Sequence, residues 1–378
     1  MPLTEARPAP LRISLLGLGT VGLEVARALL ERSDELAHAA GRPLVLVTVG
    51  VREPDRDRGL ALPAEVAKTE DLPAAAMGEG VDVVVELLGG LEPAGALVSA
   101  VLGEGRAVVT ANKALLARQG PALERASRAC AAPLRFEAAV AGGIPVLSSL
   151  ARDLAANRWQ ELLGILNGTT NHILSAMTDE GLDYAEVLAD AQARGYAEAD
   201  PAGDVEGRDA ADKLTLLCRL AFGAWLQVDA IRRSLPSRSG GEDGPPGITG
   251  VTADEIARAA EAGLVIKLVA HARRAHGGAV AASVLPSAVP AGSPLGRTGG
   301  VTNMVVLRGE PIGELRLAGP GAGGAATSSA VLADLLALAR GEGSTWASLP
   351  EAGGPEAPID GLEAVERWFE RYPIVEAA

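Results

Sequence analysis

The feature that most constrains the fold of this chain is a glycine-rich turn between a short apolar run and a helical pattern. The apolar run Leu11–Leu16 ends in the segment GLGTVG, and apolar residues then recur at spacings of three and four. In such a unit the first glycine permits a tight turn, the second lets a pyrophosphate approach the backbone, and the third lets the helix pack closely on the strand. The free N–H groups of the helix N-terminus then face the phosphates. The residues predicted to contact a dinucleotide here are Gly17, Leu18, Gly19, Thr20, Val21 and Gly22. The alternative is a glycine turn that binds no ligand.

Alternating apolar runs and helical patterns continue through the first third of the chain. Four further strands are predicted, of which the run at 81–87 has the continuous apolar character of a strand buried on both faces of a parallel sheet. They cover residues 44–51, 81–87, 107–110 and 134–139. Because helical patterns separate them, we expect a doubly wound parallel sheet of the Rossmann type over roughly residues 11–145.

The pattern changes after Pro145. Helical patterns dominate to about residue 235, and strands with turns dominate over 264–318, which is typical of an α+β domain. The segment 237–247 is rich in glycine and is expected to be a flexible surface loop. Residues 341–378 are expected to be a loosely held tail that ends in a short helix. The predicted fold class is therefore α/β, with an N-terminal Rossmann-type doubly wound parallel sheet followed by an α+β domain.

Composition excludes several classes of protein. The net charge of −14 over 378 residues does not suit general nucleic-acid binding. No stretch reaches the roughly 20 apolar residues that cross a bilayer, and the first ten residues lack the apolar segment of a signal peptide. Cys130 and Cys218 are too few for a disulfide framework, and their separation matches no zinc site. We therefore expect a cytoplasmic protein with a small-molecule substrate and without a nucleic-acid or membrane partner.

The end of the second predicted strand carries residues that would select the nucleotide. It reads Val51-Arg52-Glu53. Arg52 is suited to pair with a 2′-phosphate, which favours NADP, whereas Glu53 is suited to bind ribose hydroxyls and keeps NAD open. An ordinary surface arginine is the other interpretation of Arg52.

The segment Thr110-Ala-Asn-Lys113 follows the fourth predicted strand. It therefore lies at the carboxyl end of the sheet, where doubly wound folds bind their ligands. We expect Thr110 and Lys113 to contact the cofactor, with Asn112 and Lys113 near the nicotinamide ribose or the substrate. The alternative is a helix cap followed by an exposed charge.

A cluster of carboxylates around one lysine is the strongest candidate for chemistry. Only four of the 34 basic residues are lysines, namely Lys68, Lys113, Lys213 and Lys267. A lysine in such a chain is slightly enriched for roles that arginine cannot fill. If a helix begins near Glu206, then Glu206, Asp209 and Lys213 share one face, which continues as an apolar stripe. A hydrogen-bonded ammonium there could serve a carbonyl oxygen as hydride reaches its carbon. A solvated Asp–Lys pair is the alternative.

Three longer segments carry a resemblance to a known family. They are EAAVAGGIP at 137–145, GILNGTTNHIL at 164–174 and GYAEADPAGDVEGRDAADK at 195–213. Together with GLGTVG, TANK and the later GPGAGG at 319–324, they closely resemble homoserine dehydrogenase. The matches occur in the right order over about residues 11–340.

The resemblance implies a reaction and roles for particular residues. The reaction is the reversible reduction of L-aspartate 4-semialdehyde to L-homoserine with NAD(P)H, on the route to threonine, methionine and isoleucine. Lys213 matches the acid/base lysine of the family, and Glu198 and Asp209 match carboxylates that hold the substrate. Lys113 matches a lysine near the cofactor and substrate. Gly323 matches a glycine of the loop that closes over the nicotinamide.

The resemblance also implies a cation, a partner and a domain layout. The monovalent cation, sodium or potassium, is expected at a structural site built mostly from backbone oxygens. The matching residues are Glu137, Val140, Gly142 and Ile144. A homodimer is implied, because the middle region of the family pairs two subunits through a shared sheet. The expected parts are an NAD(P)-binding domain (1–145), a substrate-binding and dimerisation domain (146–318), a glycine-rich loop and helix that return to the nucleotide domain (319–340), and the tail (341–378). The tail is too short for the ACT domain of many members, so threonine feedback through such a domain is expected to be absent.

Two other functions are compatible with parts of this pattern. Aspartate-semialdehyde dehydrogenase handles the same aldehyde through a cysteine nucleophile. Cys130 has no neighbouring histidine and Cys218 lies in an apolar helical stretch, so neither suits that role. A dinucleotide-binding redox sensor or assembly protein would need the glycine turn but not the carboxylates around Lys213.

Overall fold

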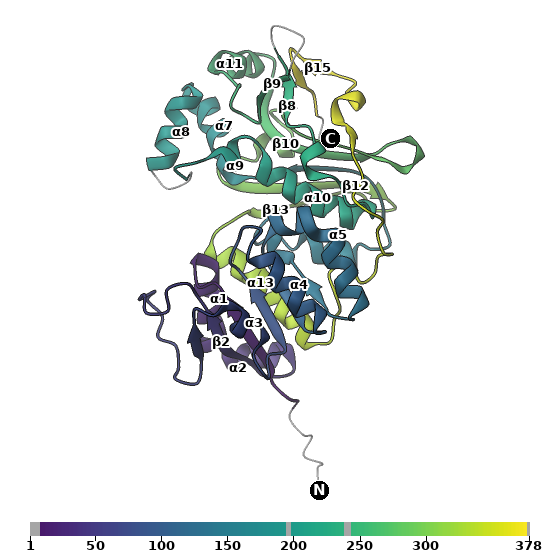
Figure 1. The fold of residues 1–378 in the computed structure, drawn as a ribbon. Helices are drawn as coiled ribbons and strands as arrows, with labels where there is room; N and C mark the ends of the chain where they lie inside the picture. Colours follow the sequence, from purple (N-terminus) through teal and green to yellow (C-terminus); the bar gives the residue numbers. More distant parts are fainter. Residues whose placement is uncertain (1–7, 194–197, 238–242, 376–378) are drawn as a thin grey trace. The chain divides into compact units, whose positions relative to one another are not determined.

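The computed structural model describes residues 8–193, 198–237 and 243–375. The chain divides into two compact units, Met1–Arg152 with Ala322–Glu351, and Asp153–Gly321 with Ala352–Ala378. Each unit has a sheet of its own (Figure 1).

The first unit is built on a six-stranded parallel sheet in the order β3-β2-β1-β4-β5-β6. The strands are β1 (Leu11–Leu16), β2 (Leu44–Gly50), β3 (Ala67–Thr69), β4 (Val83–Glu86), β5 (Ala107–Thr110) and β6 (Leu134–Arg135). The helices are α1 (Thr20–Glu31), α2 (Ser33–Ala40), α3 (Leu72–Met77), α4 (Ala94–Gly103), α5 (Lys113–Ala129), α6 (Val146–Ser148) and α13 (Gly324–Ala339). A 3₁₀ turn, η1 (Glu137–Ala139), and a π-helical turn, η2 (Ser149–Asp153), complete it. This strand order is the usual order of a Rossmann fold.

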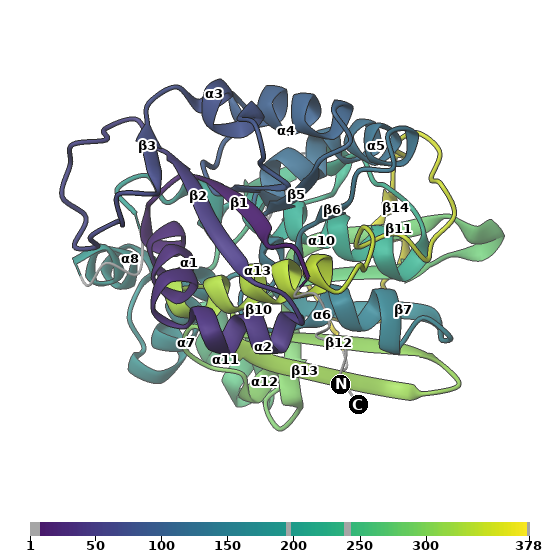
Figure 2. The same cartoon turned by 90° about the horizontal axis from the view of Figure 1, so that it is seen from below.

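Helices cover both faces of this sheet. Figure 2 shows α1, α2 and α13 on one face and α3, α4 and α5 on the other. The central strands are apolar because both of their faces are covered, and Ile13 and Leu15 of β1 are fully buried. Helix α13 comes from much later in the chain but packs against α1 and β5. The doubly wound parallel sheet is thus confirmed.

The last strand is shorter than the apolar run at 134–139 suggested. β6 ends at Arg135, and η1 follows. The reason is a change of hydrogen-bond partner, since the N–H of Glu137 donates to the carboxylate of Asp334 (2.7 Å) rather than to a strand.

The second unit contains a mixed six-stranded sheet in the order β13-β12-β7-β10-β11-β14. Its long strands are β7 (Arg158–Ile165), β10 (Leu264–Arg274), β11 (Val280–Pro290), β12 (Thr302–Glu310) and β13 (Gly313–Pro320), paired antiparallel. The short strands are β8 (Ser234–Pro236), β9 (Asp243–Pro246), β14 (Ile359–Asp360), β15 (Trp368–Phe369) and β16 (Tyr372–Pro373). The helices are α7 (Gly168–Glu180), α8 (Tyr184–Ala193), α9 (Ala202–Val205), α10 (Arg208–Phe222), α11 (Ala253–Glu261) and α12 (Pro294–Arg297), with 3₁₀ turns η3 (Val228–Ala230), η4 (His276–Gly278) and η5 (Gly361–Ala364). Helices combined with a mostly antiparallel sheet make this an α+β unit, as the sequence predicts.

Helix α10 packs on β7, β10 and β11 and begins two residues later than the spacing suggested. Gly207 precedes it in the left-handed region (φ 77°), which ends α9 and restarts the chain as α10. Glu206 therefore lies outside the helix, and its carboxylate pairs with Arg208 at 2.6 Å. Of the three residues expected on one helical face, Asp209 and Lys213 remain.

The last described residues are more ordered than their composition suggested. β14 pairs with β11, and the hairpin β15–β16 follows in place of the expected closing helix. The Tyr372 side chain is fully buried, and the N–H of Val375 donates to the carbonyl of Ala288 (3.0 Å). The expectation of a loose tail is wrong because these apolar residues pack on the sheet. Likewise, part of the segment expected as a loop forms β9, while 238–242 lie outside the described residues.

Within the described ranges, no helix combines the length and the apolar character that crossing a membrane requires.

Candidate active site

A cavity of about 900 Å³ lies at the carboxyl ends of the strands of the first unit. Three loops line it: the glycine turn after β1, the loop after β2, and the loop after β4. The lining residues are Gly17, Leu18, Gly19, Thr20, Leu23, Val51, Arg52, Glu53, Arg56, Asp57, Arg58, Leu72, Leu87, Leu88, Gly89, Gly90, Glu92 and Pro93. Five of the predicted cofactor residues line this cavity, namely Gly17, Leu18, Gly19, Thr20 and Arg52. Its position matches the ligand crevice of doubly wound sheets.

The three glycines of the turn have different spatial requirements. Gly17 has φ 100°, and a Cβ there would lie 2.6 Å from the carbonyl oxygen of Leu87. A Cβ on Gly22 would lie 2.1 Å from the carbonyl oxygen of Gly17, so only glycine lets α1 start this close to the strand. A Cβ on Gly19 would meet no heavy atom within 4 Å. Gly19 is thus the open side of the turn, and the first turn of α1 has no side-chain cap, which leaves its N–H groups available for an anion.

The loop after β2 brings more basic residues to the cavity than the sequence indicated. Arg56 and Arg58 line it beside Arg52, whose side chain is exposed. The Arg56 guanidinium pairs with the carboxylate of Glu53 at 3.5 Å, and Arg58 donates to the carbonyl of Glu53 at 2.7 Å. Glu53, the residue that would bind ribose hydroxyls, is therefore engaged within its own loop. Sequence reasoning missed Arg56 and Arg58 because nothing local distinguishes them from surface arginines.

The segment after β5 is largely occupied with structural contacts. Thr110 is fully buried, and its hydroxyl donates to the carboxylate of Glu86 at 2.6 Å. The Asn112 side chain caps α5 by accepting from the N–H of Leu115 (3.1 Å). This is the helix-cap alternative for Asn112. Lys113 is the first residue of α5 and is half-buried.

In the second unit, Lys213 is held by two acceptors. Its side chain lies on α10 and is only 7% exposed. The ammonium donates to the carboxylate of Asp209, one turn earlier on the helix, and to the backbone carbonyl of Leu166, each at 2.7 Å. The alternative of a solvated surface pair does not describe this geometry. An ammonium has three donors, so two anchors leave one N–H for another acceptor.

Two asparagines that the sequence did not single out join this cluster. The amide of Asn167, at the N-cap of α7, donates to Asp209 at 2.9 Å and to Asp204 at 2.7 Å. The amide of Asn303, on β12, donates to the same Leu166 carbonyl at 3.0 Å. Asn167 stands within the GILNGTTNHIL segment, which could have marked it. Asn303 carries no local signal.

Two other predicted residues lie apart from these contacts. Glu198 has an exposed side chain, and its backbone carbonyl accepts from Gln192 at 3.0 Å. The preceding residues 195–197 of its motif lie outside the described residues. Gly323 is the N-cap of α13, with φ 107°, in the unit that contains the glycine turn. The following glycine packs closely on α1, since a Cβ on Gly324 would lie 2.9 Å from the carbonyl oxygen of Thr20.

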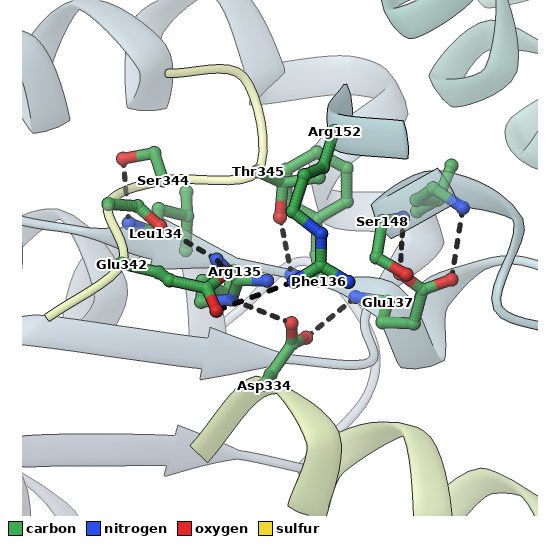
Figure 3. Close-up of polar contacts among 12 residues, drawn as sticks. Leu134, Arg135, Phe136, Glu137, Ser148, Arg152, Asp334, Glu342, Ser344 and Thr345 are labelled. Atoms are coloured by element: carbon green, nitrogen blue, oxygen red, sulfur yellow. Dashed lines mark hydrogen bonds and ion pairs between the residues drawn. The ribbon is translucent and has the colours of Figure 1, made fainter. Parts of the chain in front are cut away.

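The segment proposed to hold a cation is anchored by a buried network (Figure 3). The carboxylate of Glu137 accepts the N–H groups of Leu147 (2.9 Å) and Ser148 (2.5 Å). Its own N–H donates to Asp334, which also accepts from Arg135 at 2.8 Å. Burial and the neighbouring Asp334 charge raise the pKa of Glu137 to about 7. Figure 3 shows that this network joins the β6 end, the start of α6 and helix α13.

The backbone after Glu137 forms a sharp turn whose carbonyls can converge. Ala141 and Gly142 are both left-handed (φ 56° and 54°) and buried. No hydrogen bond reaches the carbonyls of Val140 or Gly142 from the described residues. Buried carbonyls without partners are the donors expected of a monovalent cation site. In the described ranges no cluster of three or more histidine, cysteine or carboxylate side chains forms a metal site. A cation site built mostly from backbone oxygens does not require such a cluster of side chains.

Neither cysteine has the setting of a catalytic thiol. Cys218 is fully buried within α10, and burial raises the pKa of its thiol. Cys130 is exposed at the end of α5. A nucleophilic cysteine needs a lowered pKa in an electropositive setting, so the thiol mechanism of aspartate-semialdehyde dehydrogenase is not favoured.

Comparison with protein-family models gives two matches. The NAD-binding domain of homoserine dehydrogenase matches residues 17–137, and the homoserine dehydrogenase model matches residues 145–336. Among curated proteins, the homoserine dehydrogenase of Mycobacterium tuberculosis is 43% identical over 335 residues, which is 88% of this chain and 73% of the relative. That of Corynebacterium glutamicum is 42% identical over 353 residues, with 90% and 76% covered.

Solved structures give the same result. A homoserine dehydrogenase from Thiobacillus denitrificans superimposes with a TM-score of 0.85 at 38% identity, covering 94% of this chain and 81% of that one. A hyperthermophilic archaeal homoserine dehydrogenase in complex with NADPH gives a TM-score of 0.71 at 25% identity, with 87% and 97% covered. This chain therefore belongs to the homoserine dehydrogenase family.

Proposed function

We propose that this protein interconverts L-aspartate 4-semialdehyde and L-homoserine with NADPH or NADP, as a step in threonine, methionine and isoleucine biosynthesis. The observation that carries the proposal is the buried ammonium of Lys213, fixed by two acceptors with one N–H left over. Family membership supplies the substrate class. The glycine-turn cavity supplies a place for the dinucleotide.

The Lys213 ammonium acts on the oxygen of the substrate. NADPH, when bound, supplies the hydride that reduces the aldehyde carbon. Lys213 donates its remaining N–H to the aldehyde oxygen and passes a proton to it as negative charge develops there. The neutral amine then regains a proton from solvent. In the direction of oxidation the neutral amine accepts the hydroxyl proton, and Asp209 and the Leu166 carbonyl stabilise the ammonium that forms.

The carboxylates are assigned to the substrate ammonium, and Lys113 to a place near the cofactor and substrate. Asp209 already accepts from Lys213 and Asn167, so its second role is to orient them. Glu198 is exposed and accessible to a ligand. These assignments rest on the resemblance of the motifs.

NADP is the preferred cofactor in this proposal. Arg52, Arg56 and Arg58 offer three guanidinium groups at the cavity, and the Glu53 carboxylate is paired with Arg56. A 2′-phosphate matches this charge better than two ribose hydroxyls do. The NADPH complex of the archaeal relative supports the same choice. Thr110 and Gly323 would contribute through backbone groups.

A monovalent cation is assigned to the turn after η1. The residues that would hold it are Glu137, Val140, Gly142 and Ile144. The carbonyls of Val140 and Gly142 suit this donor set because they are buried without a hydrogen bond from the described residues. A bound cation would supply structural order between η1 and α6, and no reaction step depends on it.

A homodimer, a cytoplasmic location and the domain roles complete the proposal. They rest on the family and the sequence. The second unit is assigned to the substrate and to dimerisation, and the first to the nucleotide. Size-exclusion chromatography with light scattering measures the dimer directly.

The proposal is tested by steady-state oxidation of homoserine with NADP and with NAD, with and without potassium or sodium. We expect turnover, faster with NADP. Lys213→Met should lower turnover by about 1,000-fold or more while cofactor binding persists. The matched control is Lys267→Met, which removes another buried ammonium from the same unit. Cofactor binding without turnover in the wild type would instead indicate a redox sensor, and inactivation by thiol alkylation would indicate a cysteine mechanism.

A further inference from the structure

The two acceptors that hold Lys213 are each shared with an asparagine amide. The Leu166 carbonyl accepts from Lys213 at 2.7 Å and from Asn303 at 3.0 Å. The Asp209 carboxylate oxygen accepts from Lys213 at 2.7 Å and from Asn167 at 2.9 Å. A carbonyl oxygen has two lone-pair directions, so a second donor fixes which direction remains for the ammonium.

Both anchors depend on a single stretch of backbone. Leu166 supplies the carbonyl, and the next residue, Asn167, supplies the amide that orients Asp209. This stretch lies between the end of β7 and the start of α7. Asn303 reaches it from β12, a strand that is hydrogen-bonded to β7. Movement of this stretch would displace the Leu166 carbonyl and, with it, the Asn167 amide that donates to Asp209 on α10.

The observed orientation of the Asn303 side chain costs free energy, because one of its polar atoms is buried without a partner among the described residues. Its side chain is fully buried, and its Oδ1 has no hydrogen-bond partner among the described residues. A buried acceptor without a partner costs about 1–3 kcal/mol. The reverse orientation of the amide would place Oδ1 against the Leu166 carbonyl, oxygen against oxygen. Gly321 completes the fit, since a Cβ there would lie 2.0 Å from the Asn303 Cγ. Polar groups left unsatisfied in this way call for a functional reason.

We propose that Asn303 is a positioning residue for the reaction: through the Leu166 carbonyl it fixes the direction of the remaining N–H of Lys213. The inference rests on the proposed function of Lys213. Asn167 does the same from the other side, through Asp209. Asn303 touches no reacting atom. Its effect is on the geometry of proton transfer, where an error of about 1 Å costs about 100-fold in rate.

The test uses two substitutions of Asn303 in the full chain. Asn303→Leu removes the donor and keeps the approximate volume. We expect kcat for homoserine oxidation to fall about 10- to 100-fold, with KM for homoserine changed less than about threefold and NADP binding unchanged. The pH at which kcat/KM falls should also shift. An unchanged kcat and pH profile in a folded variant would overturn the inference.

Asn303→Asp gives a test that does not depend on the leucine variant folding. A protonated carboxyl can donate to the Leu166 carbonyl, whereas the carboxylate cannot and also competes for the Lys213 ammonium. The Lys213 ammonium favours the charged form of this carboxyl, so the donor to the Leu166 carbonyl stays absent, and kcat should be below that of wild type at every pH from about 6 to about 9. A kcat equal to that of wild type in this folded variant would overturn the inference.

A matched control separates positioning from general destabilisation. Asn171 is also buried, and its amide donates to the carbonyls of Thr298 and Thr302. Asn171→Ala should lose comparable thermal stability yet keep the wild-type pH profile. A shift of the profile in this control would overturn the inference, since destabilisation alone would then produce it. A wild type that does not oxidise homoserine refutes the proposed function, whereas an active wild type with unaffected Asn303 variants refutes only the positioning role.

Discussion

The buried Glu137 carboxylate makes the stability of the first unit depend on pH in a way that a single substitution removes. Its side chain is 3% exposed, and it accepts two backbone N–H groups at the start of α6. Burial and the charge of Asp334 raise its pKa from 4.5 to about 7. Glu137→Gln keeps the size of the side chain and abolishes its titration.

The sign and the size of the effect follow from the pKa. Between pH 4.5 and about 7 the folded protein keeps a proton on Glu137 that the unfolded chain has released. The free energy of unfolding therefore falls as pH rises through this window, by about 1.4 kcal/mol per pH unit and about 3 kcal/mol in all. The glutamine variant lacks this loss. It does place an NH₂ against one backbone N–H, which costs about 1–3 kcal/mol at every pH.

We therefore expect Glu137→Gln to be less stable than wild type below about pH 5 and equally or more stable above about pH 7. For a unit of this size, a change of about 3 kcal/mol in relative stability corresponds to about 6–12 °C in Tm. The Tm of the variant minus the Tm of wild type should therefore change by about this amount between the two ends of the pH range. The assay is thermal unfolding in buffers from about pH 4.5 to 8 without sodium or potassium. Exposed Glu79 supplies the control, since Glu79→Gln removes the same charge from the surface.

Parallel stability curves for wild type and Glu137→Gln would refute the reasoning, because they would mean that Glu137 titrates alike in the folded and unfolded states. Repeating the series with potassium tests the cation proposal as well. A cation bound beside the carboxylate favours its charged form, so added potassium should flatten the wild-type curve, whereas the slope of the variant curve should not change.

Three further predictions concern other parts of the molecule. Gly22→Ala must displace the turn, because the new Cβ would lie 2.1 Å from the carbonyl oxygen of Gly17. We therefore expect the Kd for NADPH, measured by fluorescence titration, to rise about tenfold or more. Wild-type affinity would contradict the role of this turn. Arg52→Ala should weaken NADPH binding about 10- to 100-fold and leave NADH nearly unchanged. Equal losses for both nucleotides would mean that Arg52 does not contact the 2′-phosphate. Tyr372→Ala should destabilise the second unit by about 3 kcal/mol, seen by thermal unfolding, because the ring is fully buried. An unchanged Tm would show that the hairpin is not docked.

Much of the first unit could be predicted because its signals are local. An apolar run, three glycines at fixed spacing and a helical pattern follow one another within about 20 residues. The same holds for Asp209 and Lys213, whose spacing of four places them on one face of α10. Glu206 was predicted wrongly there, because the left-handed Gly207 starts the helix after it.

Composition was misleading for the last segment. Glycine and proline at 341–378 favoured a loose tail, but burial of Tyr372 and pairing with β11 hold its described part in place. A segment of low regularity can still dock when a few large apolar side chains find a surface. That surface lies on strands more than 70 residues earlier in the chain, where no local pattern reveals it.

By itself the sequence determined the glycine turn, the alternation of the nucleotide unit and the pairing of Asp209 with Lys213, because each depends on neighbours a few residues apart. Only the tertiary structure decided that Lys213 binds the Leu166 carbonyl, that Asn303 shares this carbonyl from 137 residues away, and that Arg135 meets Asp334 across 199 residues. Such contacts follow from how sheets and helices pack, and packing brings together residues whose local sequences show no relation.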